Sequence, residues 1–243
     1  MVMKPSARIA RMAGLAGLLL AWPASLHPQA LPSDRSDERA RMVHEQIGER
    51  GMEDQAVLGA MLAVPRHLFV PDAHRGRAYG DHPLPIGHGQ TISQPYIVAF
   101  MTELLELEPG DQVLEVGTGS GYQAAVASML ADSVFSVEIV PELAADAAAR
   151  LDRLGYRDVQ VRNADGYFGW EEHAPYDAIF VTAAAGHVPP PLVQQLVPGG
   201  RMAIPVGGPF QVQNLVLVEK SVDGTVTTRS VLPVQFVPLT GAH

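Results

Sequence analysis

The sequence predicts an α/β fold in which a doubly wound, mainly parallel β-sheet is preceded by helices and ends in an antiparallel edge. Three observations support this prediction. From residue 112 onward, short apolar runs alternate with amphipathic or alanine-rich segments, as β-α-β units do. A glycine-rich loop follows the first of those runs. Near the C-terminus, two strand-like runs flank Asp223-Gly224, a pair that favours a hairpin turn.

The composition supports a folded core and excludes several kinds of chemistry. Of the 243 residues, 47% are hydrophobic and 18% are charged, which is unlike a disordered chain. Lysine and arginine total 17 against 26 acidic residues, and a net charge of −9 argues against nucleic acid as a partner. The absence of cysteine excludes disulfides, thiolate nucleophiles and cysteine-ligated metal centres.

The first 30 residues have the layout of an export signal. Lys4, Arg8 and Arg11 precede an apolar run of 11 residues at 12–22. That run is shorter than the roughly 20 residues that a membrane-spanning helix needs, so no permanent membrane span is expected. We therefore expect a periplasmic or exported protein whose main domain covers residues 34–243. A cytoplasmic protein is the alternative, because the segment has no Ala-x-Ala cleavage motif.

The N-terminal third is expected to be helical around one long loop. Apolar residues spaced among charges predict two amphipathic helices between residues 34 and 63, broken near Gly51. A loop rich in proline, glycine and histidine follows at 65–93, and loops of this length usually carry function. A helix over 94–107 ends before Pro109-Gly110. The four histidines of the loop have no metal-chelating spacing, so no metal site is expected.

The remaining elements follow in regular alternation. Strands are expected at 112–116, 134–138, 159–162, 178–182 and 202–206. Helices are expected at 122–130, at 141–154 with a proline in its first turn, and near 192–196. The two C-terminal strands are expected at 214–219 and 225–232.

The loop after the first strand carries the strongest local signal. Its glycines alternate at 117, 119 and 121, but Tyr122 stands where a dinucleotide-binding fingerprint requires glycine. The acidic Glu115 would also repel a pyrophosphate and favour a cationic ligand. These features indicate S-adenosylmethionine, with its ammonium and sulfonium groups. We expect contacts from Glu115, Gly117, Thr118, Gly119, Ser120 and Gly121.

Two further acidic positions follow neighbouring strands. Glu138 ends the second strand and could accept the ribose hydroxyls, and Asp165-Gly166 after the third strand could lie near adenine. Each also has a plainer interpretation, as a solvated strand end or as a turn. Together with the glycine loop they favour a ligand, because open α/β sheets bind ligands at the carboxyl ends of their strands.

The segments at 64–71, 83–96, 101–105, 181–185, 204–207 and 236–240 carry a family resemblance. Through them the chain resembles protein-L-isoaspartate O-methyltransferases over about residues 37–240. The glycine loop is shared by many methyltransferases, whereas the segment at 90–95 is much more specific to this family. The resemblance implies a Rossmann-like class I methyltransferase that methylates the free α-carboxyl of isoaspartyl residues in damaged proteins or peptides. The ester then closes to a succinimide, whose hydrolysis returns some normal aspartate.

The resemblance also assigns roles to individual residues. It implies that Ser93 is the active-site serine, that substrate contacts come from Ile86, Gly87, Ser93 and Val234, and that further cofactor contacts come from Gln90, Thr91, Ile92, Ser93 and Thr240. It divides the chain into helices and substrate loop (34–110), cofactor core (111–206) and C-terminal strands (207–243), and a monomer is expected. The sequence departs from the family at Ala164, where glycine is usual, and at Gln235, where many relatives have arginine.

The local sequence leaves the role of Ser93 open between two interpretations. Because Pro95 lies in the first turn of the expected helix, Ser93 could be its N-cap. The resemblance favours a hydrogen bond to the substrate carboxylate, which is ionised at neutral pH and needs no general base. Three other functions remain alternatives: methylation of a small carboxylic acid, a non-catalytic cofactor-binding protein, and a dinucleotide oxidoreductase, which Tyr122 disfavours.

Overall fold

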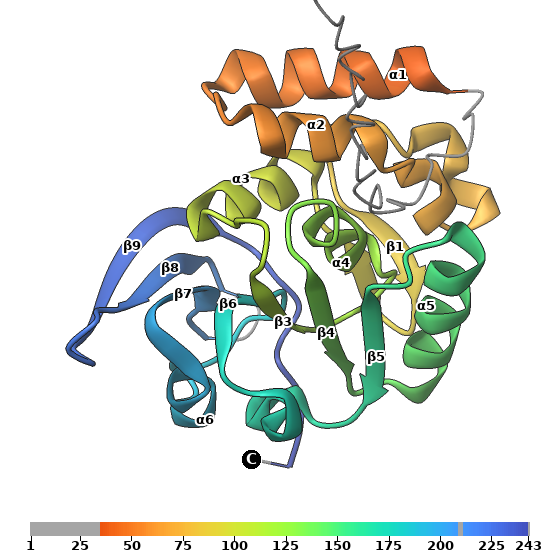
Figure 1. Ribbon diagram of the computed structural model, residues 1–243. Coiled ribbons are helices and arrows are strands. Elements are labelled where there is room, and N and C mark those ends of the chain that lie inside the picture. Colours follow the sequence, from red (N-terminus) through yellow and green to blue (C-terminus); the bar gives the residue numbers. More distant parts are fainter. Residues whose placement is uncertain (1–34, 209–210, 243) are drawn as a thin grey trace, which may run out of the picture.

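The computed structural model describes residues 35–208 and 211–242, and its centre is a seven-stranded sheet (Figure 1). The strand order is β5-β4-β3-β6-β7-β8-β9. The first five strands in that order are parallel, and β8 and β9 are antiparallel. The strands are β3 Gln112–Val116, β4 Ser133–Glu138, β5 Val159–Asn163, β6 Tyr176–Val181, β7 Leu196–Val206, β8 Gln213–Lys220 and β9 Val226–Val234. The predicted sheet and its antiparallel edge are confirmed.

Alternation along the buried strands gives the sheet an apolar surface on both faces. Val113 packs on one face with α3 (Pro95–Leu105) and α4 (Tyr122–Ala127). Its neighbour Leu114 packs on the other face with α6 (Pro190–Gln194). The alanine-rich helix α5, Pro141–Leu154, has the predicted bounds. Helices on both faces are what a doubly wound sheet requires.

The N-terminal helices form a separate layer against α3 and α4 (Figure 1). Helix α1, Ser36–Arg41, continues through a π-helical turn, Met42–Ile47, and a 3-10 turn, Gly48–Arg50. Helix α2, Gln55–Ala63, begins at Asp54, whose side chain accepts from the N–H groups of Ala56 and Val57. The predicted break near Gly51 is confirmed.

The segment at 65–93 is more regular than predicted. It contains two 3-10 helices, Arg66–Phe69 and Asp72–Arg77, and an antiparallel hairpin of β1 (Leu84–Gly87) and β2 (Gln90–Ile92). The prediction of an irregular loop was wrong. Proline and glycine are uncommon in strands, so the sequence of this segment lacks the pattern that predicts a strand. Leu84 pairs with Ile92, and both side chains are buried in the N-terminal core.

No helix in 35–208 or 211–242 combines the length and the apolar character that crossing a membrane requires. The export-like segment at 1–30 lies outside the described residues.

Candidate active site

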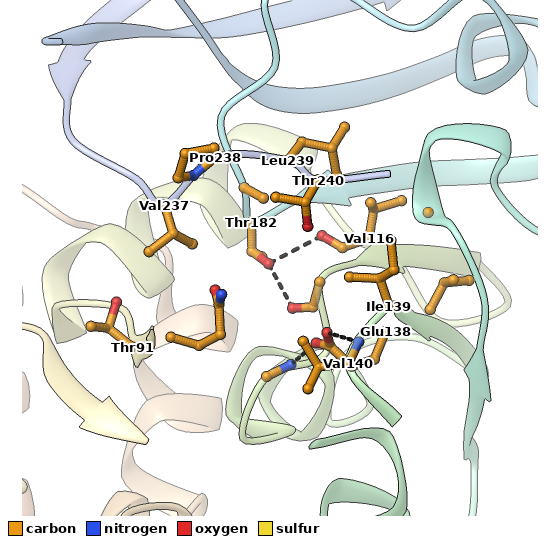
Figure 2. Close-up of a pocket in the computed structure, with 16 residues that line it drawn as sticks. Thr91, Val116, Glu138, Ile139, Val140, Thr182, Val237, Pro238, Leu239 and Thr240 are labelled. Atoms are coloured by element: carbon orange, nitrogen blue, oxygen red, sulfur yellow. Dashed lines mark hydrogen bonds between the residues drawn. The ribbon is translucent and has the colours of Figure 1, made fainter. Parts of the chain in front are cut away.

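Two hollows meet at the carboxyl ends of the parallel strands. Pocket A is an open hollow of about 540 Å³ over β3, β4 and β6 (Figure 2). Figure 2 places Val237 to Thr240 on one side of it and Glu138 to Val140 on the other, with Thr182 between them. The full lining is Gln90, Thr91, Val116, Gly117, Gly119, Val137, Glu138, Ile139, Val140, Gly166, Thr182, Ala183, Val237, Pro238, Leu239 and Thr240.

The glycine loop approaches Thr182 so closely that position 117 has no room for a side chain. Gly117 has φ +98°, and a Cβ there would lie 2.4 Å from Thr182 Oγ1. The Thr182 hydroxyl donates to the carbonyl oxygen of Gly117 at 2.6 Å, as Figure 2 shows. This contact joins the end of β6 to the loop after β3 and keeps backbone, not side chain, at the wall of pocket A.

Glu138 presents a carboxylate to pocket A from the end of β4. The side chain is buried, and its two oxygens accept from the N–H groups of Gly119 at 2.8 Å and Val140 at 3.0 Å (Figure 2). A carboxylate has about four acceptor sites, so acceptor capacity remains for a ligand. An acceptor held in this way suits a pair of ribose hydroxyls.

Glu115 is a buried carboxyl below the glycine loop. It is 1% exposed, the hydroxyl of Ser136 donates to Oε2, and Oε1 has no hydrogen-bond partner among the described residues. Burial raises the pKa of Glu115 to about 8. A cation nearby would favour the ionised form, so this position suits the positive charge predicted from the sequence.

A smaller hollow, pocket C, leads from Glu115 to the segment before α3. It is an open hollow of about 330 Å³, and its wall includes Thr118, Ser120, Ile92 and Ser93. Pocket C therefore brings the glycine loop and the predicted active-site serine to one space.

Pocket B, of about 1,040 Å³, lies on the other side of Thr91, Thr182 and Val237, which line both A and B. Its remaining lining is Pro83, Ser93, Gln94, Ile97, Val212, Pro233, Val234, Gln235 and Phe236. None of these described side chains is ionisable. A charged group entering pocket B would be held by hydroxyl, amide and backbone groups.

The N-cap interpretation of Ser93 is wrong. The N-cap of α3 is Gln94, with ψ 138°, because Pro95 already occupies the first turn. The carbonyl oxygen of Ser93 accepts from Arg66 Nη2 at 2.6 Å, and no described residue hydrogen-bonds its hydroxyl. The side chain lines pockets B and C and is available to a ligand.

The structure brings together most of the residues predicted to bind the cofactor. Pocket A contains Gln90, Thr91, Gly117, Gly119, Glu138, Gly166 and Thr240, and pocket C contains Thr91, Ile92, Ser93, Glu115, Gly117, Thr118, Gly119 and Ser120. Gly121 lines neither pocket. A Cβ there would lie 3.1 Å from the Leu151 side chain, so this glycine serves the packing of α5.

Asp165, predicted near adenine, does not itself line pocket A. Its carboxylate accepts from the N–H groups of Tyr167 and Ala242, both at 3.0 Å, and it borders a different hollow from pocket A. Its neighbour Gly166 does line pocket A, where a Cβ would lie 2.5 Å from Val116 Cγ1. Asp165 therefore holds the C-terminal segment through its hydrogen bond with Ala242.

The predicted substrate residues separate into two groups. Ser93 and Val234 line pocket B. Ile86 and Gly87 line none of pockets A, B and C. Instead, the Ile86 side chain packs over the glycine loop, with Cδ1 3.2 Å from where a Cβ on Gly119 would be.

Sequence reasoning did not assign site roles to Thr182 or to residues 237–239. The C-terminal segment lies beside the end of β6, where Ala184 N–H donates to the carbonyl oxygen of Val237 and Leu239 N–H donates to that of Ala184. The bonds measure 2.8 and 2.7 Å. These residues lie within the segments at 181–185 and 236–240 that resemble the family, and that resemblance could have indicated a site role. The local sequence did not indicate that the two segments lie side by side.

Comparisons with known proteins agree on one family. A family model described as protein-L-isoaspartate(D-aspartate) O-methyltransferase matches residues 37–243. A protein-L-isoaspartate O-methyltransferase 1 of Cupriavidus necator is 56% identical over 94% of this chain and 91% of its own length. A protein-L-isoaspartate O-methyltransferase 2 of Polaromonas sp. is 62% identical over 84% of this chain and 98% of its own.

Solved structures of proteins with the same name share the fold. One protein-L-isoaspartate O-methyltransferase superposes with a TM-score of 0.76 at 31% identity, covering 83% of this chain and 66% of that one. A putative one from Plasmodium falciparum, in complex with S-adenosyl-L-homocysteine, gives a TM-score of 0.71 at 25% identity, over 83% of this chain and 98% of that one.

Proposed function

The chain belongs to the protein-L-isoaspartate(D-aspartate) O-methyltransferase family, and we propose that methyl transfer takes place where pockets A and B meet, beside Thr91 and Ser93. The protein is an S-adenosylmethionine-dependent methyltransferase of isoaspartyl residues. The observation that carries the proposed location is that Thr91 lines both pockets while Ser93 has an uncommitted hydroxyl.

Pocket A fits the cofactor. Gly117 and Gly166 keep bare backbone at the wall of pocket A, and Glu138 keeps acceptor capacity for a ribose. Glu115, in the adjoining pocket C, has an oxygen with no partner among the described residues, which suits a cationic group. Glu138, Glu115 and the loop at 117–120 would hold it. S-adenosylmethionine supplies, when bound, a methyl group on a positively charged sulfur.

Pocket B fits an isoaspartyl segment whose carboxylate reaches the junction. The carboxylate is ionised at neutral pH, so the chain need not supply a base. Ser93 can donate a hydrogen bond that orients one oxygen, whereas the Thr182 hydroxyl already donates to Gly117. Apolar side chains such as Ile97, Val234 and Phe236 in the wall of pocket B would displace water from that oxygen when the substrate binds. Rate enhancement comes from orientation and desolvation.

Transfer of a labelled methyl group tests the proposal directly. The substrates are a peptide with one isoaspartyl residue, the same peptide with aspartate, and a free dicarboxylic acid. We expect labelling of the isoaspartyl peptide alone. Equal labelling of both peptides, or labelling of the free acid alone, would contradict the proposed substrate. Binding of the cofactor without any transfer would favour the non-catalytic alternative.

We also propose that residues 1–30 direct export and that the mature protein acts as a monomer without nucleic acid. The support is the basic and apolar N-terminal layout together with the net charge of −9. N-terminal sequencing of the protein recovered from periplasmic and cytoplasmic fractions tests the first part. An uncleaved protein found in the cytoplasm alone would contradict it. Light scattering with size-exclusion chromatography, with and without a DNA duplex, tests the second.

A further inference from the structure

Arg66 is a fully buried arginine whose guanidinium holds two separate backbone segments. The side chain is 0% exposed and lies at the start of the 3-10 helix Arg66–Phe69. Its Nε donates to the carbonyl oxygen of Ala78 at 2.8 Å, and its Nη2 donates to that of Ser93 at 2.6 Å. The planar fork of arginine holds donors on separate nitrogens in fixed directions, whereas the three donors of a lysine ammonium share one nitrogen and reach two distant acceptors less well.

The two acceptors stand on either side of the β1–β2 hairpin. Ala78 precedes β1 and Ser93 follows β2 directly, so one side chain fixes both ends of the segment that contains the hairpin. That hairpin carries Gln90 and Thr91 into pocket A, and its Ile86 packs over Gly119. A shift of the guanidinium would move groups in pockets A, B and C together.

The same guanidinium also lies over the start of α4. Its central carbon is 5.0 Å from the centre of the Tyr122 ring, and Tyr122 is the residue immediately after the glycine loop. Arg66 therefore contacts both the segment that ends in Ser93 and the helix that follows the glycine loop. The relative position of these two segments sets the distance between substrate and cofactor.

No described carboxylate pairs with Arg66, and its electrostatic partners are Tyr122 and Tyr79. Burial lowers the pKa of Arg66 to about 10, so the side chain keeps its charge at neutral pH. An unpaired buried cation is costly to stability unless its hydrogen bonds are well formed. Two carbonyl oxygens and an aromatic face compensate in part, while Nη1 is buried with no hydrogen-bond partner among the described residues.

We infer that Arg66 is a positioning residue for methyl transfer, which sets the Ser93 hydroxyl and the β1–β2 hairpin against the glycine loop. The inference rests on the proposed location of transfer beside Ser93. Because small misplacements of reacting groups can reduce rates by about 10²-fold, loss of the fork should affect turnover more than cofactor binding.

The test uses Arg66→Lys in the full chain, with Arg39→Lys as its matched control. Arg39 is also a buried arginine of the N-terminal layer, and it donates to the carbonyl oxygen of Leu62 and to the hydroxyl of Tyr79, neither of which lines pocket A, B or C. For each variant we would measure kcat and KM with the isoaspartyl peptide, the Kd of S-adenosylhomocysteine, and Tm.

Arg66→Lys is expected to lower kcat by roughly ten- to a hundredfold, with the Kd of S-adenosylhomocysteine changed less than about threefold. Arg39→Lys should lower Tm to a comparable extent and leave kcat within about twofold. Equal kcat in the two variants would overturn the inference. So would an Arg66→Lys variant that fails to fold, or one that loses cofactor binding in proportion to kcat, since either assigns the residue a general structural role. An inactive wild-type protein would instead contradict the proposed function.

Discussion

At the scale of single residues, Glu115 combines deep burial with an incomplete set of partners. Ser136 donates to one oxygen, while the other has no described partner. Desolvation raises the pKa of Glu115 to about 8, with a further contribution from the nearby Glu138. The cofactor-free protein therefore holds a proton at Glu115 that the unfolded chain has already released at pH 7.

Glu115→Gln is expected to flatten the pH dependence of stability. Between an ordinary carboxyl pKa of 4.5 and the folded value of about 8, the native state binds more protons than the unfolded state. The free energy of unfolding of the wild type therefore falls as pH rises from about 5 to 8, by up to about 1.4 kcal/mol per pH unit from this group. Urea unfolding at several pH values measures it. An unchanged slope in the variant would contradict the assignment.

Ser93→Ala is expected to lower kcat while leaving the cofactor site intact. A hydrogen bond to a charged group contributes about 1.5 to 3 kcal/mol, which corresponds to a loss of roughly ten- to a hundredfold. Because the hydroxyl does not cap α3, the helix should remain stable. Ser128→Ala is the control, since that buried hydroxyl donates to the carbonyl oxygen of Ala125. Equal kcat in both variants would show that Ser93 does not orient the substrate.

At the scale of elements, a regular spacing of apolar residues predicted helix and strand bounds correctly, whereas segments interrupted by proline and glycine were predicted wrongly. Helix α5 and strand β3 have the predicted bounds, because their apolar spacing matches one period throughout. The β1–β2 hairpin was missed, since Pro85 interrupts its first strand, which ends at Gly87, and its turn contains only His88 and Gly89. Burial of its inward residues in the N-terminal core decides that structure, and local propensity opposes it.

The junction between β3 and α4 gives a prediction for Gly117→Ala. The positive φ and the closeness of Thr182 Oγ1 should together reduce stability by about 1 to 3 kcal/mol and weaken binding of S-adenosylhomocysteine. Adding Thr182→Ala removes the close oxygen and should restore part of the loss. Gly186→Ala, where a Cβ meets open space, is the control. Calorimetry measures both quantities. A double variant no better than Gly117→Ala would contradict the steric explanation.

At the scale of the whole molecule, pocket A joins the main sheet, the β1–β2 hairpin and the C-terminal segment. Residues as distant in sequence as Gln90, Glu138 and Thr240 line it. A ligand in this pocket contacts all three parts, so its binding should stabilise the fold as a unit.

S-adenosylhomocysteine is therefore expected to raise Tm. At a concentration of a hundred times Kd, binding adds about 2.7 kcal/mol, which for a domain of this size is a shift of roughly 5 to 11 °C. Differential scanning calorimetry measures the shift. NAD⁺ at the same concentration serves as the control and should have no effect. A comparable shift with NAD⁺ would favour the oxidoreductase alternative over the specificity predicted from Tyr122.

The sequence by itself determined the succession of strands and helices from residue 112 onward, the glycine loop with its neighbouring Glu115, and the family through its motifs. These are local features, because the backbone of a strand, a helix or a tight turn depends on residues close by in the chain. Only the tertiary structure decided that Ser93 is held by Arg66 and that Asp165 holds the C-terminal segment. Those contacts join residues 27 and 77 positions apart. They follow from the packing of the layers, which no local pattern encodes.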